Sequence, residues 1–349
     1  MSLTVLYQIP FLETVYALRF VYDGYRTAFG DRGHKFRPLT AGDNLEEVLD
    51  SYQPDILITI LNKYYLKFLD LELLKKYRKK GLVVFNQIRP WKHQTSQFGA
   101  QALESKPGLI KLIKNGLAGD ILFHWLEQDD PAMEGFTETT GYPFYTILMA
   151  ADVNKYYHDY DEEYQADISF VGSCLPTKRD FIKKHVFPLM KKYNVRVYGV
   201  DWTLTSRMLG YIQKAGQYFN IKPLIGIRKV PLLADRKVYS SSTISLNIHE
   251  NHQRKFGSDF NERTFKIPAS GGFEICDNVK VIRKYFNEDE LVVAENTADW
   301  FEKIDYYIRN PEKRIPIIEA GRRKVLREHT YHNRVKQIIQ IYKDFNGLS

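Results

Sequence analysis

The stretch FNERTFKIPASGGFEICD, residues Phe260–Asp277, decides how the second half of this 349-residue chain folds. A helix-like run ends in Ala269-Ser270-Gly271-Gly272, and a short apolar strand, Phe273–Cys276, follows directly. Just ahead lies LNIHEN, Leu246–Asn251, in which another apolar strand ends in polar side chains. Because glycine has no Cβ, paired glycines allow backbone N–H groups to approach a ligand closely. The stretch therefore predicts a ligand site between two strands of an α/β domain.

The same stretch resembles the CgeB-like, or spore-maturation-protein, family of glycosyltransferases, which is related to group 1 glycosyltransferases and has the two-Rossmann GT-B architecture. The family carries the run N-x-R-T-F-E-I-x-A-x-G between two C-terminal strands. The matching residues are Asn261, Arg263, Thr264, Phe265, Ile267, Ala269 and Gly271. One departure is Lys266, which stands where the family usually has Glu. The resemblance covers Ala166 to Arg334 and extends more weakly over Tyr145–Asn154.

Composition predicts a globular protein with two domains. The hydrophobic content of 44% and aromatic content of 14% are ordinary for a folded chain, and the length exceeds that of one average core. No apolar run approaches the roughly 18 residues that span a bilayer. The N-terminal sequence MSLTVLYQIPF is typical of a first buried strand. The only cysteines, Cys174 and Cys276, fit no metal motif and favour a reducing cytoplasm without a disulfide.

The net charge of +8 has two interpretations that the sequence leaves open. A basic surface attracts anionic partners such as nucleotide diphosphates, anionic lipid or nucleic acid, or it merely keeps the protein soluble. The densest cluster, Lys75–Lys80, ends an expected helix, Leu66–Lys80, where cations suit the helix dipole. The alternative for this cluster is a weak peripheral contact with the inner face of the membrane. Basic residues are spread along the chain without a nucleic-acid motif, so no nucleic-acid partner is predicted.

Alternating strands and helices in both halves predict doubly wound α/β domains. In the first half the expected strands are Leu3–Gln8, Lys35–Leu39, Asp55–Ile60, Gly81–Phe85, Asp120–Trp125 and Tyr145–Met149, with helices at about Leu12–Phe29 and Leu45–Ser51. In the second half the expected strands are Asp167–Gly172, Val195–Tyr198, Thr243–Ile248, Phe273–Cys276 and Leu291–Ala294. The expected helices there are Lys178–Lys192, Leu232–Ser240, Thr297–Asn310, Pro311–Glu328 and Tyr331–Phe345, with an irregular stretch over Thr203–Pro231.

These elements predict three parts. Residues 1–160 form an acceptor-side Rossmann-like domain, 161–330 a donor-binding one, and 331–349 a helix that crosses back to the first domain, as the resemblance implies. The acidic, aromatic stretch Tyr156–Gln165 is interpreted as the linker between the domains.

A phosphate site is predicted after the strand Asp167–Gly172. Gly172-Ser173 leads into a helix with Lys178 and Arg179 in its first turn, and the positive end of a helix attracts anions. The family has F-V-G-S here followed by a basic residue, which implies contact with the donor phosphates. The alternative is an ordinary turn with solvated cations.

Further donor contacts are expected at the carboxyl end of the strand Thr243–Ile248, where open α/β sheets bind ligands. Asn247 and His249 stand there, and His249 is a candidate for catalysis or for bonding the sugar or a phosphate. Arg263 has the planar fork that suits phosphate or sugar, whereas the alternative is a solvent-facing helix position. Gly271 and Gly272 complete the predicted donor site.

Lys266 leaves the ribose contact open. In related enzymes the Glu at this point accepts bonds from the ribose hydroxyls, and a Lys ammonium has no acceptor. Glu262, four residues earlier, takes over that role while Lys266 pairs with it, or the two form a merely exposed pair. Otherwise Glu274 or the backbone holds the ribose, or the chain has lost activity.

The first domain offers candidates without a recognised acceptor site. His124 and Asp130 are the candidate general bases, and the alternative for Asp130 is an N-cap before Pro131. Further candidates after the strand Gly81–Phe85 are Asn86, Arg89, Trp91, for which a core position is the alternative, and His93.

Together, these observations predict a glycosyltransferase that moves a sugar from a nucleotide-diphosphate sugar to an unidentified acceptor, a surface polysaccharide, glycolipid or protein. Enzymes of this architecture generally need no metal, so the resemblance implies neither a metal nor another cofactor. The alternative is a catalytically inactive nucleotide-sugar-binding protein on the same scaffold.

Overall fold

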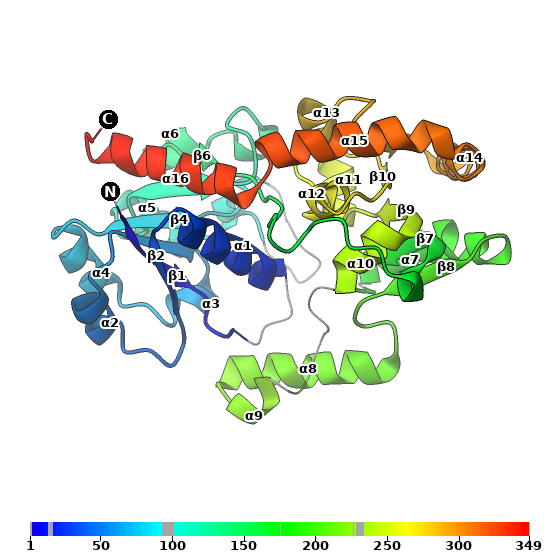
Figure 1. Ribbon diagram of the computed structural model, residues 1–349. Coiled ribbons are helices and arrows are strands. Elements are labelled where there is room, and N and C mark those ends of the chain that lie inside the picture. The colour runs from blue at the N-terminus through cyan, green and yellow to red at the C-terminus, as the bar shows by residue number, and fades with distance from the viewer. Residues whose placement is uncertain are drawn as a thin grey trace. The chain divides into compact units, whose positions relative to one another are not determined.

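The computed structural model describes residues 2–12, 17–92, 101–174, 176–225, 227 and 234–348, and the chain divides into two compact units (Figure 1). Unit 1 comprises Met1–Leu148 together with His332–Ser349, and unit 2 comprises Met149–Tyr331. The division therefore falls after Leu148, whereas the sequence predicts it after residue 160.

Unit 1 contains a six-stranded parallel sheet with the order β2-β1-β3-β4-β5-β6. Its strands are β1 Thr4–Gln8, β2 Lys35–Leu39, β3 Ile56–Ile60, β4 Val83–Gln87, β5 Ile121–His124 and β6 Tyr145–Thr146. Each expected strand of the first half is present. The central strands are mostly apolar and buried, as in β3 with its sequence ILITI.

The helices of unit 1 follow the strands and return the chain to the same edge of the sheet. They are α1 Ala17–Asp31, α2 Leu45–Tyr52, α3 Lys63–Leu66, α4 Leu71–Arg78, α5 Pro107–Lys114, α6 Phe136–Thr140 and α16 Tyr331–Phe345, with short 3-10 turns η1 Leu103–Ser105 and η2 Pro131–Met133. Asn44 caps α2. The single helix expected over Leu66–Lys80 is wrong, because Asp70 caps a new helix at Leu71.

Unit 2 contains a five-stranded parallel sheet with the order β11-β10-β9-β7-β8. Its strands are β7 Ala166–Val171, β8 Val195–Tyr198, β9 Ser242–Asn247, β10 Glu274–Asp277 and β11 Val292–Ala294. All five expected strands are present within a few residues of their predicted bounds. The two parallel sheets with interleaved helices confirm the predicted α/β class.

The helices of unit 2 include one long element that the sequence pattern did not predict. They are α7 Pro176–His185, α8 Leu204–Phe219, α9 Lys222–Ile225, α10 Ala234–Ser241, α11 Asn251–Phe256, α12 Arg263–Ala269, α13 Ile282–Tyr285, α14 Thr297–Arg309 and α15 Pro311–Glu328, with η3 Glu162–Tyr164 and η4 Phe187–Lys191. The expectation of an irregular stretch over Thr203–Pro231 is wrong, because α8 and α9 occupy much of it. Thr203 caps α8 by accepting the N–H of Ser206 at 3.1 Å.

The predicted linker lies inside unit 2, where it packs along α10. Asp159 and Asp161 form ion pairs with Arg236 and Lys237 at 2.7 and 2.8 Å. The buried Tyr156 donates its hydroxyl to Asp235 at 2.9 Å. Acidic residues of the segment thus form ion pairs with basic residues of α10.

The C-terminal helix α16, red in Figure 1, belongs to unit 1. Its Val335 and Ile338 are buried, Arg334 donates to the carbonyl of Leu148 at 3.0 Å, and Gln337 donates to that of Thr146 at 2.8 Å. This arrangement is the predicted return of the chain to the first domain. Among the described residues, no helix has the length and apolar character that crossing a membrane requires.

Candidate functional site

The carboxyl ends of three neighbouring strands in unit 2 gather most of the predicted site residues. Strands β7, β9 and β10 are adjacent and parallel, so the loops that follow them lie at one edge of the sheet. Ligands of open α/β sheets bind at that edge. We call the side chains of Lys178, Asn247, His249, Glu250, Arg263 and Asp277 the strand-edge cluster.

Arg263 is fixed at the end of β9 by two hydrogen bonds. Its Nε donates to Oδ1 of the buried Asn247 at 3.0 Å, and its Nη2 donates to the carbonyl of Ile248 at 2.8 Å. Asn247 in turn donates to Glu274 Oε1 at 2.7 Å. The guanidinium also stands over the ring of Phe170. The solvent-facing alternative for Arg263 is therefore wrong, and the guanidinium is held in one orientation.

Lys178 is a second cation of the cluster and is almost fully buried, with 4% of its surface exposed. Its Nζ lies 2.6 Å from Glu250 Oε1. Burial and the neighbouring Arg263 charge lower the pKa of Lys178 to about 8, although Glu250 opposes this shift. The alternative of solvated cations is thus wrong for Lys178. Arg179 follows Lys178 directly in the chain. Its Nε is buried and has no hydrogen-bond partner in the described part of the chain.

His249 is fully buried and is oriented by a carboxylate from the next strand. Its Nδ1 lies 2.6 Å from Asp277 Oδ1, and its backbone N–H donates to the same oxygen at 2.9 Å. Arg254 donates to Oδ2 of Asp277 at 3.2 Å. Burial by itself would raise the pKa of Asp277, but His249 and Arg254 outweigh it and the pKa is lowered.

The imidazole of His249 presents its other nitrogen as an acceptor. Burial lowers the pKa of His249, so the neutral ring is favoured, and a proton on Nδ1 then faces the carboxylate of Asp277. Nε2 is buried, and no described residue bonds to it. A buried acceptor without a partner is uncommon and suits a ligand that donates a hydrogen bond.

Glu262 and Lys266 form the predicted pair, at 2.7 Å between Oε1 and Nζ. The pair is buried rather than exposed, because only 3% of Lys266 is accessible and its Nζ lies 4.9 Å from the ring centroid of Tyr156. The exposed-pair alternative is therefore wrong. Oε2 of Glu262 is buried without a hydrogen-bond partner among the residues described. Glu262 thus keeps one carboxylate oxygen for another donor.

The two glycines after α12 are explained by the chain itself. Gly271 has φ +72°, and the N–H groups of Gly271 and Gly272 donate to the carbonyls of Pro268 and Ile267 at 2.9 and 3.0 Å. These bonds end α12 in the manner of a glycine cap. A Cβ on Gly272 would lie 2.7 Å from the carbonyl oxygen of Tyr239. The two N–H groups are already used, so the role predicted for them in ligand binding gains no support here.

Gly172, by contrast, allows a close approach at the site. A Cβ at this position would lie 2.9 Å from the ring of Phe170 and 3.2 Å from Nη1 of Arg263. The bare backbone therefore leaves room for the guanidinium beside β7. Ser173 follows it, half-buried, at the carboxyl end of the strand.

The candidates of unit 1 have structural surroundings. His124 is buried, accepts the N–H of Leu126 on Nδ1 at 2.9 Å, and has a pKa lowered by burial to about 3. Asp130 caps η2 by accepting the N–H of Ala132 at 2.7 Å, which confirms the N-cap alternative. Trp91 is buried against Phe136, which confirms its core position.

Two more candidates of unit 1, one within β4 and one after it, gain no clear functional role. Asn86 is buried and donates to the carbonyl of Ala118, while Arg89 is half-buried, and burial lowers its pKa. His93 lies outside the described residues.

Asp277 and Arg254 are the functional candidates that the sequence motifs did not single out. Asp277 ends the quoted stretch and is the last residue of the strand next to β9. A carboxylate at the end of a strand next to a strand-end histidine is a signal that would have identified the pair.

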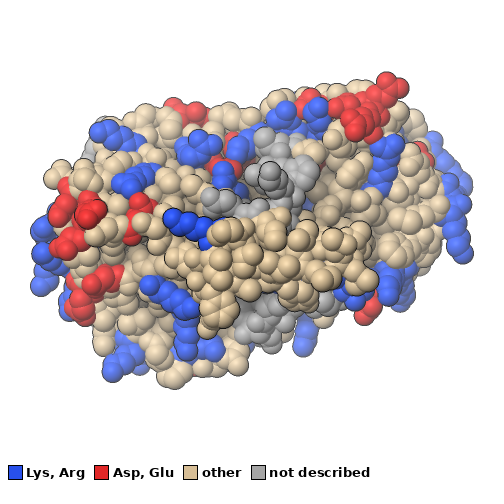
Figure 2. Space-filling view, turned by 90° about the horizontal axis from the view of Figure 1, so that it is seen from below, with Lys and Arg blue, Asp and Glu red and all other residues tan. Residues whose placement is uncertain are grey.

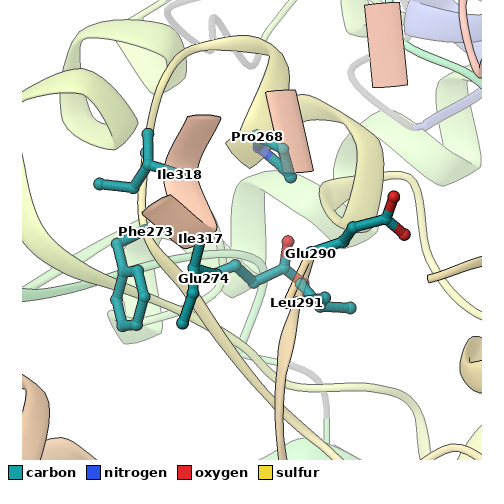
Figure 3. Close-up of a pocket in the computed structure, with 8 residues that line it drawn as sticks. Pro268, Phe273, Glu274, Glu290, Leu291, Ile317 and Ile318 are labelled. Atoms are coloured by element: carbon teal, nitrogen blue, oxygen red, sulfur yellow. The ribbon is translucent and has the colours of Figure 1, made fainter. Parts of the chain in front are cut away.

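A small pocket lies elsewhere in unit 2 (Figure 3). Pro268 from α12, Phe273 and Glu274 at the start of β10, and Ile317 and Ile318 from α15 surround it, with Glu290 and Leu291 just before β11. These residues stand at the amino ends of β10 and β11, whereas parallel sheets bind ligands at the carboxyl ends, although Glu274 also accepts a hydrogen bond from Asn247 of the cluster. We therefore assign no part of the strand-edge cluster's chemistry to it. In the described ranges no group of three or more His, Cys, Asp or Glu side chains is placed to hold a metal ion.

Comparison with known proteins supports the fold strongly. Residues 179–340 match the model of a glycosyl transferase-like family. No curated protein matches the sequence. A glycosyltransferase from Rickettsia africae ESF-5 is similar over 100% of both chains at 13% identity, with a TM-score of 0.61.

Two further solved structures are similar over nearly their whole length. The catalytic domain of starch synthase IV from Arabidopsis thaliana, bound to ADP and acarbose, covers 99% of each chain at 11% identity with a TM-score of 0.62. An alpha-glucosyltransferase in complex with UDP and a 13-mer DNA covers 98% of this chain and 100% of its own at 13% identity, also with a TM-score of 0.62. The chain thus has the GT-B fold, and residues 179–340, which carry all of the strand-edge cluster except Lys178, match a glycosyl transferase-like family.

Proposed function

We propose that this protein is a glycosyltransferase whose unit 2 binds a nucleotide-diphosphate sugar at the strand-edge cluster and whose unit 1 receives the acceptor. The family match over residues 179–340 and the GT-B fold support this interpretation. Structural neighbours are described in complex with UDP and with ADP, which is consistent with a nucleotide donor. The run around Arg263 favours the CgeB-like subtype within this class.

The observation that carries the proposal is the placement of two cations, Lys178 and Arg263, together at the strand edge. Each is held by protein contacts, and their mutual repulsion contributes to the lowered pKa of Lys178. Holding like charges together in a buried site costs free energy, and a diphosphate would remove that cost. The same charges would stabilise the nucleoside diphosphate as it leaves with the electrons of the glycosidic bond.

Unpartnered buried atoms beside these cations suit the rest of the donor. Nε2 of His249 is an acceptor for a sugar hydroxyl, and Oε2 of Glu262 is an acceptor for a ribose hydroxyl. Glu262 then replaces the family's Glu at position 266, while Lys266 holds its other oxygen. Because Lys178 and Arg263 supply positive charge at the phosphates, we propose transfer without a metal or other cofactor. The acceptor is a surface polysaccharide, a glycolipid or a protein.

The test is calorimetry with UDP, GDP, TDP, ADP and CMP and their sugars, in the presence of EDTA. One nucleoside diphosphate should bind, and Arg263→Met should weaken it by about 100-fold, because two charge-assisted hydrogen bonds to phosphate are lost. The matched control is Arg309→Met, which removes the same charge from an exposed position on α14. Absence of binding by every nucleotide would reject the proposal.

Glu262→Gln tests the proposed contact between Glu262 and the ribose. Glutamine has the same shape and keeps one acceptor oxygen for Lys266, but it loses the second carboxylate oxygen. We expect weaker binding of the nucleotide and also a lower melting temperature, because the buried Lys266 keeps a hydrogen bond but loses its counter-charge. Unchanged nucleotide affinity would show that Glu262 does not contact the donor.

A second candidate function, a non-catalytic nucleotide-sugar-binding protein, is favoured by Lys266 alone. A cation stands where the family usually has the ribose-binding carboxylate, and it is buried in an ion pair. Under this candidate the donor binds, but neither transfer nor slow hydrolysis of the sugar follows. Release of free nucleoside diphosphate from the bound donor, followed by chromatography, distinguishes the two.

A further inference from the structure

Helices α8 and α9 form a hairpin, residues 204–225, whose outer face is strongly apolar. Five large side chains on α8 are more than three-fifths exposed: Leu204 at 74%, Met208 at 64%, Tyr211 at 69%, Tyr218 at 65% and Phe219 at 66%. Such side chains normally occur singly on a protein surface. Here they gather on one helix.

Helical spacing places these side chains in one stripe. Leu204, Met208, Tyr211 and Phe219 recur at intervals of three, four or eight residues, which is the period of one helix face. The opposite face is used by the hairpin itself. Gln213 donates to the carbonyl of Ile225 at 2.8 Å, and a Cβ on Gly216 would lie 2.6 Å from Cβ of Leu224. The apolar stripe therefore remains exposed when α8 packs on α9.

The charged side chains of the hairpin itself are of one sign. No Asp or Glu occurs from Trp202 through Ala234, whereas Arg207, Lys214 and Lys222 lie on the two helices. Figure 2, seen from below, shows a tan band without charged side chains over α8, which lies at the bottom of Figure 1. Lys214 stands near the ring of Tyr211, at 5.8 Å from its centroid.

We propose that the α8–α9 hairpin lies on an anionic lipid surface, with its apolar stripe inserted among the acyl chains and its cations among the headgroups. A helix with one apolar face, tyrosines, and only basic charges has the composition of interfacial membrane helices. Its cations attract the negative surface potential of anionic lipids.

The charge pattern disfavours a second copy of the chain as the occupant. A symmetric pairing through this stripe would bring Arg207, Lys214 and Lys222 of one copy against the same residues of the other. The hairpin offers no carboxylate to compensate that repulsion. An anionic bilayer satisfies both the apolar and the cationic features. This inference concerns a surface separate from the strand-edge cluster and does not rest on the proposed function.

The test is flotation of the full chain with vesicles. Vesicles of phosphatidylcholine containing about one third phosphatidylglycerol should carry the protein at low salt, whereas pure phosphatidylcholine should carry much less. Met208→Glu and Phe219→Glu should each lower the partition coefficient by about tenfold or more, because an apolar contact is replaced by a charge that anionic lipid repels. Lys214→Gln should lower it by about fivefold.

Matched controls lie on α15, also in unit 2. Ile315 is 57% exposed, so Ile315→Glu places the same charge on a comparable surface position. Lys313→Gln removes one exposed cation. Both should float like the unmodified chain, and all variants should keep its melting temperature, since the altered side chains are exposed.

Two outcomes would overturn the proposal. One is absence of flotation with anionic vesicles at low salt. The other is a dimer, detected by light scattering without lipid, that Met208→Glu converts to a monomer, since the stripe would then bind a second copy.

Discussion

Two buried histidines stand at strand ends, one in each unit, and their surroundings differ in kind. His124 ends β5 of unit 1 and accepts a backbone N–H, with burial holding its pKa at about 3. His249 follows β9 of unit 2 and faces the carboxylate of Asp277, with Arg263 and Lys178 among the groups that lower its pKa. The first is a packed core histidine, whereas the second is one member of a connected set of charges. The position of a histidine at a strand end is therefore a weak guide to its function. The charged groups that surround the histidine are a better guide.

The largest expected effect comes from breaking the carboxylate that orients His249. Asp277→Ala leaves the His249 ring, its backbone N–H and the Arg254 guanidinium without their acceptor. We expect the free energy of unfolding to fall by about 4 kcal/mol, the cost of breaking a buried ion pair. Urea denaturation measures it, and amide hydrogen exchange should locate the loss in β9 and β10. A loss below about 1 kcal/mol would mean that the cluster is not held together by this carboxylate.

A second prediction concerns the free energy that it costs to ionise the buried carboxyl group of Glu274, which lies beside the strand-edge cluster. Burial raises the pKa of Glu274 to about 8 from 4.5, so the folded state holds its proton where the unfolded state has lost it. Its stabilising contribution is therefore present at low pH and is lost as pH rises from 4.5 through 8, by about 3 kcal/mol between pH 5 and pH 8.

Glu274→Gln tests this cost. The glutamine oxygen still accepts the Asn247 amide, and the neutral side chain does not titrate. The variant should be more stable than the unmodified chain at pH 8 and similar at pH 5 in parallel denaturant titrations. Equal pH profiles for the two proteins would contradict the raised pKa.

The third prediction uses the core histidine of unit 1. The pKa of His124 is lowered from 6.5 to about 3, so the unfolded state takes up the proton first as pH falls. The free energy of unfolding should drop by about 2 kcal/mol between pH 8 and pH 5 through this residue alone. His124→Asn places an oxygen near the Leu126 N–H and cannot titrate, so it should show a shallower acid slope. An unchanged slope would show that another group dominates acid sensitivity in unit 1.

The smallest expected effect is on donor affinity, and it compares the two histidines by their contribution to binding. His249→Asn should weaken binding of the nucleoside diphosphate or its sugar by about tenfold, or about 1.4 kcal/mol, because asparagine keeps a donor for Asp277 but has no atom at the position of the acceptor Nε2. His124→Asn serves as the control and should leave that affinity unchanged. Calorimetry at pH 7 compares the two. An equal loss of nucleotide affinity in both variants would contradict the proposed functional difference between the two histidines.

Much of the fold follows from sequence because its signals are local. Continuous apolar runs such as Ile56–Ile60 predict buried parallel strands, and the apolar period of Tyr331–Phe345 predicts α16 with its observed bounds. The missed helix α8 had a local signal too. Thr203 as N-cap and apolar residues at helical spacing were present, but the long polar-apolar mixture around them resembled a loop.

The site could be predicted only in outline, because its contacts join distant residues. His249 and Asp277 meet only because β9 and β10 are neighbours, and Lys178 meets Glu250 only because β7 lies beside β9. The order of strands in a sheet cannot be predicted from any single stretch of sequence. Arg263 was found because its motif is contiguous, whereas Asp277 and Arg254 were missed because their partners come from separate elements.

The return of α16 to unit 1 has a consequence for biosynthesis. Unit 2 is one continuous stretch, Met149–Tyr331, whereas unit 1 needs residues from His332 onward. On the ribosome, unit 2 therefore has its full complement of residues before unit 1 does. We therefore expect the two units to complete folding in the reverse of the usual order, in which the domain translated first also folds first. Until its last helix emerges, the nascent first domain leaves exposed the surface that Val335 and Ile338 later cover.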